Sequence, residues 1–202
     1  MKKLNRKGFT LIELLAVITI MGILMLVAIP AVSRTIENTR RDTFASTAKS
    51  YIKAVRDEIA ADNIYTDDGD TPISAAPAGY YYYGFNTAEG NSATDLMEQG
   101  GKSSWGNANV KGYVAVKKDV DDKNNTKYSY AIFMVDTGSR GIGVLTLENS
   151  IKRSTVVTKD APAGDTKPTA AKNKANEDIE TFDGEVLNAT GENSNCKALS
   201  LG

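Results

Sequence analysis

The chain has 202 residues, no histidine, a single cysteine and a formal net charge of -1 at pH 7. Without histidine, a serine or cysteine nucleophile lacks its usual general base and zinc lacks its commonest nitrogen ligand, and a single cysteine forms neither an intramolecular disulfide nor a thiolate cluster. We therefore expect no enzymatic activity, no cofactor and no metal site.

An apolar segment near the N-terminus determines the broad class of protein. It runs from Phe9 to Ile29 and is preceded by four basic residues. The polar interruptions are Thr10, Glu13, Thr19 and Gly22. About 20 apolar residues are enough to cross a bilayer as a helix. Because basic residues keep their side of the membrane cytoplasmic, the remainder of the chain is expected to be exported.

Glu13 is the only charged residue inside this segment. A carboxylate in hydrocarbon costs roughly 2.5 kcal/mol or more, so such a residue is a functional candidate by default. A cleaved signal peptide fits less well, because its apolar region spans only about 7 to 15 residues and Pro30 makes Ala28 and Ala31 a poor cleavage site. A plain membrane anchor explains the length, but neither Glu13 nor the abrupt Gly8–Phe9 junction.

The motif from Gly8 to Glu13 (GFTLIE), followed by an uninterrupted apolar helix, resembles the N-terminus of type IV prepilins. The resemblance implies that a prepilin peptidase and methyltransferase cuts between Gly8 and Phe9 and methylates the new amino group of Phe9. Residues 1–8 are then a short leader, similar to those of the type IVa class. Its removal deletes four basic residues and leaves an acidic mature chain, so no specific nucleic-acid partner is expected.

The same resemblance suggests a partner for Glu13. In the family, the matching carboxylate is thought to meet the N-terminal amine of a neighbouring subunit. Cleavage creates a positive amine at Phe9, and pairing offsets part of the cost of placing charge in hydrocarbon. We expect Glu13 to set the register between subunits rather than to add much net stability. The alternative is a glutamate that snorkels to the membrane interface.

Gly22 and Pro30 flank a weak section of the predicted helix. Proline removes a backbone hydrogen bond, and glycine lowers helix propensity by about 1 kcal/mol, so a kink near Pro30 is expected. The resemblance implies that this section is extended in assembled pili. We therefore expect residues 22–30 to be helical in the membrane and to unwind in a filament, although two helices broken at Pro30 are an alternative.

A one-sided apolar stripe indicates that the helix continues to about Ala61. Its members recur at spacings of three and four residues, as on one face of a helix. They are Phe44, Ala48, Tyr51, Ile52, Val55 and Ile59. A globular head is expected to cover this face.

The remaining sequence predicts an antiparallel sheet. Strands are expected at Val110–Lys117, Tyr128–Val135 and Ile142–Leu147, joined by hairpin turns and packed by one face on the helix. The tyrosine cluster Tyr80–Phe85 favours a partly buried strand over an exposed contact surface. Ser154–Val157 is a candidate fourth strand. A short helix is expected near residues 93–99.

The C-terminal region carries weaker signals. Residues 159–178 are typical of a solvated loop, and a short hairpin is expected around Asp183–Gly184. Cys196 departs from the disulfide-stapled C-terminus of many pilins and is either free or paired between subunits. The acidic pairs Asp67/Asp68 and Asp121/Asp122 indicate solvated turns more than calcium ligands. Four lysines are expected to decorate an exposed hairpin end: Lys117, Lys118, Lys123 and Lys127.

These features predict an α+β protein. Its parts are a leader (1–8), a transmembrane and filament-core helix (9–30), the amphipathic half of the same helix (31–62) and a β-rich extracellular head (63–202). The resemblance implies a type IV pilus subunit, first a single-pass membrane protein and then part of a surface fibre for adhesion, twitching motility or biofilm formation. Its expected partners are other pilin subunits, the prepilin peptidase, the assembly platform with its ATPase, and membrane lipid.

Two alternative functions stay open at this point. One is a pseudopilin of a type II secretion or competence DNA-uptake system, which shares the same N-terminal motif. The other, from a different class, is a single-pass anchored extracellular enzyme or binding domain.

Overall fold

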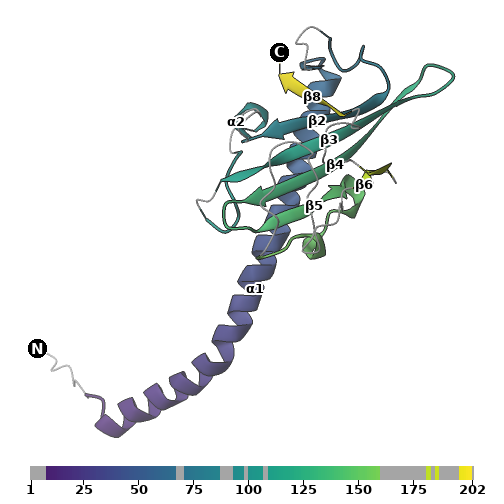
Figure 1. Cartoon of the computed structure of the whole chain (residues 1–202). Helices are drawn as coiled ribbons and strands as arrows, with labels where there is room; N and C mark the ends of the chain where they lie inside the picture. Colours follow the sequence, from purple (N-terminus) through teal and green to yellow (C-terminus); the bar gives the residue numbers. More distant parts are fainter. Residues whose placement is uncertain are drawn as a thin grey trace, which may run out of the picture. The chain divides into compact units, whose positions relative to one another are not determined.

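The computed structural model describes residues 8–66, 71–86, 93–97, 100–106 and 109–159, together with the backbone of 181–182, 185–186 and 196–201. Within these ranges the chain is an α+β protein, with a long N-terminal helix and a mainly antiparallel sheet (Figure 1). It divides into two compact units, residues 1–39 and 40–202.

Helix α1, Leu11–Ala60, contributes to both units. In the first unit it is apolar on all sides, and each large apolar side chain from Phe9 to Val32 is more than half exposed. By length and composition this part of the helix is able to cross a membrane. Pro30 lies inside α1, so the alternative of two helices broken there is wrong for this structure. Unwinding of residues 22–30 in a filament stays a prediction.

In the second unit, the predicted apolar stripe of α1 is buried. Its six members, from Phe44 to Ile59, are each 5% exposed or less. They pack with one face of the sheet, which contributes Tyr81, Val114 and Ile132 to the same core. The central strands of this sheet are antiparallel neighbours: β2 (Gly79–Phe85), β3 (Val110–Val120), β4 (Thr126–Asp136) and β5 (Gly141–Leu147).

The opposite face of the sheet is also apolar and buried. Tyr113 and Phe133 are each 1% exposed there, and their rings stack with centroids 5.5 Å apart. Strand β3 alternates accordingly, because successive side chains of a strand point to opposite faces. Val114 and Val116 enter the core beside α1, whereas Tyr113 and Ala115 enter the second cluster.

Two strands at the other edge of the sheet were not expected from the sequence. The order of the six strands is β1-β8-β2-β3-β4-β5, with β1 at Ile64–Thr66 and β8 at Cys196–Leu201. Strand β8 is antiparallel to β1 and parallel to β2. The backbone of Cys196 therefore lies opposite Tyr80, while its side chain is outside the described part of the chain.

The predicted fourth strand at Ser154–Val157 is wrong. Residues Arg153–Thr155 form a 3-10 helix, η2, and Val157 makes only an isolated bridge to Gly141. The physical reason is local, because the Thr155 hydroxyl donates to the Lys152 carbonyl at 2.7 Å and accepts from the Lys152 amide at 3.3 Å. Such side-chain bonds compete with pairing in a sheet.

The shorter expected elements are present. Helix α2 is Ala93–Leu96, in the region where a short helix was expected. A second 3-10 helix, η1 (Glu148–Ser150), was not expected from the sequence. The hairpin expected around residues 183–184 is formed by β6 (Thr181–Phe182) and β7 (Glu185–Val186), which pair antiparallel. The predicted loop at 159–178 lies outside the described residues from residue 160 onward.

Candidate functional site

The start of α1 contains a reciprocal hydrogen-bonded pair. The backbone N–H and the hydroxyl of Thr10 both donate to the Glu13 Oε2 atom, at 2.8 and 2.7 Å. The Glu13 N–H donates back to the Thr10 hydroxyl oxygen at 3.3 Å. This is a capping box, which satisfies backbone donors that the first turn of a helix otherwise leaves open. The sequence signature of a capping box, threonine followed three residues later by glutamate, is visible in the sequence but was not among the sequence-based predictions.

Glu13 is surrounded by exposed apolar side chains. Leu11 and Ile12 are 84% and 72% exposed, and Leu14 and Leu15 are also more than half exposed. A continuous apolar surface of this kind is unfavourable in water and marks a surface covered by lipid or by protein. The Glu13 carboxylate is therefore the one negatively charged group in this apolar surface to which a positive charge can bind.

The predicted cleavage position lies just before the capping box. Gly8 and Phe9 are exposed and lie outside any regular element, two or three residues before α1 begins. A Cβ atom at Gly8 would meet nothing within 4 Å, so the described residues do not crowd the position of a side chain there. The leader residues 1–7 lie outside the described residues. Cleavage, methylation of Phe9 and the register role of Glu13 remain predictions.

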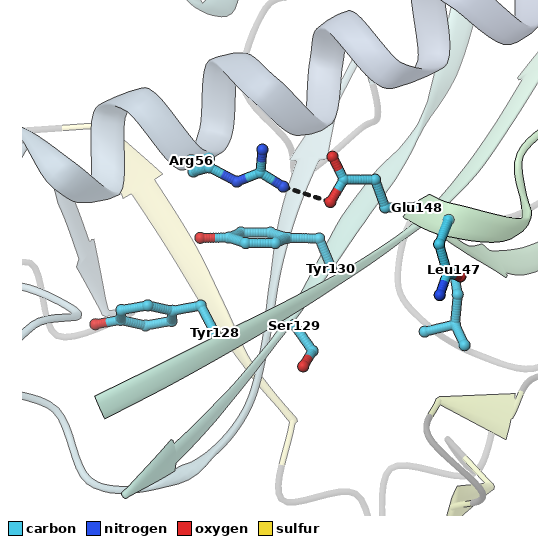
Figure 2. Close-up of a pocket in the computed structure, with 7 residues that line it drawn as sticks. Arg56, Tyr128, Ser129, Tyr130, Leu147 and Glu148 are labelled. Atoms are coloured by element: carbon cyan, nitrogen blue, oxygen red, sulfur yellow. Dashed lines mark hydrogen bonds and ion pairs between the residues drawn. The ribbon is translucent and has the colours of Figure 1, made fainter. Parts of the chain in front are cut away.

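The second unit contains a cavity of about 330 Å³ between α1 and the end of β5 (Figure 2). The Arg56 guanidinium lies 4.8 Å above the ring of Tyr130 and is ion-paired with Glu148. Burial raises the pKa of Tyr130 to about 12. The lining residues are Arg56, Tyr128, Ser129, Tyr130, Leu147, Glu148 and Asn149.

Lys118 corrects a prediction, because it is buried rather than displayed at the hairpin end. Lys118 is only 3% exposed. Its Nζ atom donates to the carbonyls of Ile73, Ser74 and Ala76 at 3.0, 2.6 and 2.6 Å. Burial lowers the pKa of Lys118. A charged lysine enters a core only when its donors are satisfied, and three carbonyls match the three donors of an ammonium group.

The other predicted lysines and the pair Asp121/Asp122 lie at the surface or next to it. Lys117 is partly buried and sits 3.6 Å from Asp119, whereas Lys123 and Lys127 are exposed. Asp121 accepts three hydrogen bonds from the turn, from the Lys123 N–H at 2.9 Å and from the Asn125 N–H and side-chain amide at 2.7 and 2.8 Å. This supports a solvated turn.

The pair Asp67/Asp68 lies outside the described residues. Within the described residues, no group of three or more His, Cys, Asp and Glu side chains is placed to hold a metal ion.

Comparison with known protein families identifies a prokaryotic N-terminal methylation motif over residues 3–29. This motif is the leader signature of type IV prepilin-like proteins. Together with a long apolar helix that continues onto an antiparallel sheet, it defines a type IV pilin-like arrangement. The motif supports a pilin-like or pseudopilin-like protein. No curated protein and no solved structure matches the chain.

Proposed function

We propose that this chain is a structural subunit of a type IV pilus, and that its activity is assembly rather than catalysis. The carrying observation is the combination at the N-terminus. A methylation motif leads directly into a helix whose apolar side chains are exposed on every side and interrupted by one carboxylate, Glu13. Packing of such helices from many subunits removes this surface from lipid and from water.

Glu13 has two successive partners in this proposal. Before assembly, its carboxylate is held by Thr10 in the capping box. After cleavage at Gly8, the amine of Phe9 on a neighbouring subunit competes for the same carboxylate. The bonds from Thr10 come from neutral donors, whereas the amine carries a full positive charge, so the exchange is favourable when the two subunits are in register. A subunit out of register leaves a charge unpaired, which is costly in hydrocarbon.

The subunit is proposed to be a single-pass membrane protein first and part of a surface fibre afterwards. Adhesion, twitching motility and biofilm formation are the functions that such a fibre supports. Its partners are other pilin subunits, the prepilin peptidase, the assembly platform and its ATPase. The pseudopilin alternative shares the N-terminal motif, so processing alone does not separate the two functions.

N-terminal mass spectrometry of material sheared from the cell surface tests the proposal. A chain beginning at N-methyl-Phe9 and abundant in the sheared fraction is expected for a pilus subunit. The same processed chain confined to the envelope supports the pseudopilin alternative. A chain that still begins at Met1 and remains in membranes would contradict both.

Replacement of Glu13 tests the assembly mechanism separately from processing. In Glu13→Ala, cleavage after Gly8 is expected to continue, whereas the yield of sheared fibre falls at least tenfold because the amine of each incoming subunit is left unpaired. Glu37→Ala is the matched control, because Glu37 is another glutamate of α1 and lies beyond the apolar run that ends at Ile29. Undiminished fibre from Glu13→Ala would show that register is set in another way.

A further inference from the structure

Strand β4 has a free stretch of edge at its start. β4 begins at Thr126, but its pairing with β5 starts only at Ala131, opposite Leu147. Residues 126–130 pair with β3 on their other side, and in the described part of the chain nothing pairs with their second edge. Figure 1 shows this hairpin running beyond the end of β5. An unpaired edge presents backbone N–H and C=O groups to any other extended chain.

The cavity of Figure 2 lies beside this edge. The chain leaves the line of β5 after Leu147, because η1 begins at Glu148. Ser129 and Tyr130, from the free edge, line the cavity together with Leu147 and Glu148 from the point where β5 ends. Natural edges are commonly protected by proline or a bulge. Residues 126–130 contain no proline, and the irregularity of the β4–β5 ladder lies further along, between Ile132 and Met134.

The charges at this edge favour an acidic ligand. Arg56 is fixed above the Tyr130 ring and tethered through Nη2 to Glu148, yet its side chain is 42% exposed. A planar guanidinium fork binds carboxylates with good geometry, and an aromatic ring behind it holds the plane in place. Lys127, on the free edge itself, is exposed, lies opposite Asp119 of β3 and is the kind of charged side chain that protects natural strand edges. Among the described residues, Glu148 is the only acidic residue that lines the cavity.

We propose that the free edge of β4, residues 126–130, binds an extended peptide that carries acidic side chains. The peptide adds as a strand beside β4, where its backbone pairs with the free N–H and C=O groups. A carboxylate on the face of the peptide that points to α1 binds Arg56, because alternate side chains of a strand share a face. In binding by strand addition, the main chain supplies affinity and the side-chain contacts supply specificity. This site is independent of the proposed assembly through α1.

Hydrogen exchange measured by mass spectrometry tests the site in the full-length protein in detergent micelles. The probe is the peptide Thr-Val-Glu-Val-Glu-Val-Thr, acetylated and amidated, which alternates in the manner of a strand. Its titration is expected to slow the exchange of amides in residues 126–130 in a saturable way. The counterpart with glutamine in place of both glutamates is expected to bind about tenfold more weakly, since a hydrogen bond to a charged group is stronger than a neutral one.

Two charge-removing variants on the same helix give the matched comparison. Arg56→Gln is expected to weaken binding of the glutamate peptide about tenfold and to leave the glutamine peptide unchanged. Lys53→Gln, whose side chain is 72% exposed and pairs with Asp57, is expected to change neither. Because the two peptides are also compared on the unmodified protein, the test does not depend on the folding of a variant.

Three results would overturn the proposal. The first is the absence of protection at residues 126–130 at millimolar peptide. The second is equal loss of binding in the Arg56 and Lys53 variants. The third is protection, without peptide, of those amides in residues 126–130 that point away from β3, which means that this chain or a second copy of it already fills the edge.

Discussion

At the scale of single residues, two charged groups in apolar surroundings, Glu13 and Lys118, are the most informative about assembly and stability. The Glu13 carboxylate, in the exposed apolar part of α1, accepts two hydrogen bonds from Thr10. The Lys118 ammonium, in the core of the second unit, donates to three carbonyls. Each charge is costly without those partners, so removing either member of such a pair tests what the contact does.

Thr10→Val removes the capping hydroxyl while keeping the shape of the side chain. The loss of a helix cap costs about 1 kcal/mol, so amides in the first turn of α1 are expected to exchange several-fold faster in micelles. Thr19→Val is the control, because its hydroxyl bonds only to the Ala16 carbonyl inside the helix, at 2.8 Å. Equal exchange in both variants would show that the capping box does not hold the helix start.

Lys118→Met leaves three loop carbonyls without their donor. We expect the free energy of unfolding to fall by about 2–4 kcal/mol, because buried acceptors lose their only cation. The measurement is denaturant unfolding followed by the fluorescence of Trp105, the sole tryptophan. Lys123→Met, at an exposed position of the turn, is expected to change stability by less than about 0.5 kcal/mol. A similar small effect for Lys118→Met would contradict the buried ammonium.

At the scale of elements, the turn between β4 and β5 fastens a neighbouring loop to the helix. Asp136 accepts from the Ser103 hydroxyl at 2.7 Å and from Arg140 Nε at 3.0 Å. Arg140 lies 5.3 Å from the ring of Trp105, whose own ring lies 5.5 Å from that of Phe44 on α1. The turn, the loop and the helix are thus connected by one chain of side chains.

Gly141→Ala tests this junction. Gly141 has φ +138°, and an added Cβ would lie 2.4 Å from the Met134 carbonyl oxygen and 2.8 Å from the Phe44 ring. A backbone conformation suited to glycine together with a backbone clash is expected to cost at least about 2 kcal/mol of stability. Gly79→Ala is the control, because its nearest contact would be 3.8 Å, in the ordinary van der Waals range. Equal unfolding midpoints for the two variants would contradict this account.

At the scale of the whole molecule, the chain consists of two compact units with different kinds of surface. The described part of residues 1–39 exposes an apolar helix, whereas the described part of residues 40–202 buries apolar side chains on both faces of a sheet. A unit with its own core keeps its stability when the other is changed. In the proposed function, the first unit therefore serves assembly, and the stability of the second unit does not depend on it.

Leu24→Arg places a charge at a 63% exposed position of the apolar helix. A charge there costs roughly 2.5–3.5 kcal/mol on membrane insertion, so the surface fibre is expected to be lost. The unfolding midpoint of the second unit, followed by Trp105 fluorescence, is expected to stay unchanged. Ser33→Arg, beyond the apolar run, is the control for charge alone. A lowered midpoint in Leu24→Arg would show that the two units are coupled.

Local pattern in the sequence determined the apolar helix, the buried stripe from Phe44 to Ile59 and the central strands. Such features depend on the length of an apolar run and on spacings of two, three or four residues, which are visible without any partner. The short η2 turn, by contrast, was mistaken for a strand, because its side-chain bonds outweighed the β-branched composition of Ser154–Val157.

Only the tertiary structure decided the insertion of β8 between β1 and β2, the burial of Lys118 and the cavity at Arg56. Each depends on residues far apart in the chain, since Cys196 lies opposite Tyr80, Lys118 reaches the Ile73 carbonyl and Arg56 pairs with Glu148. A lysine near a strand end has the same local pattern whether it is solvated or enclosed. The difference depends on a loop, distant in the sequence, that places three backbone carbonyls around the ammonium group. No spacing in the sequence predicts that contact.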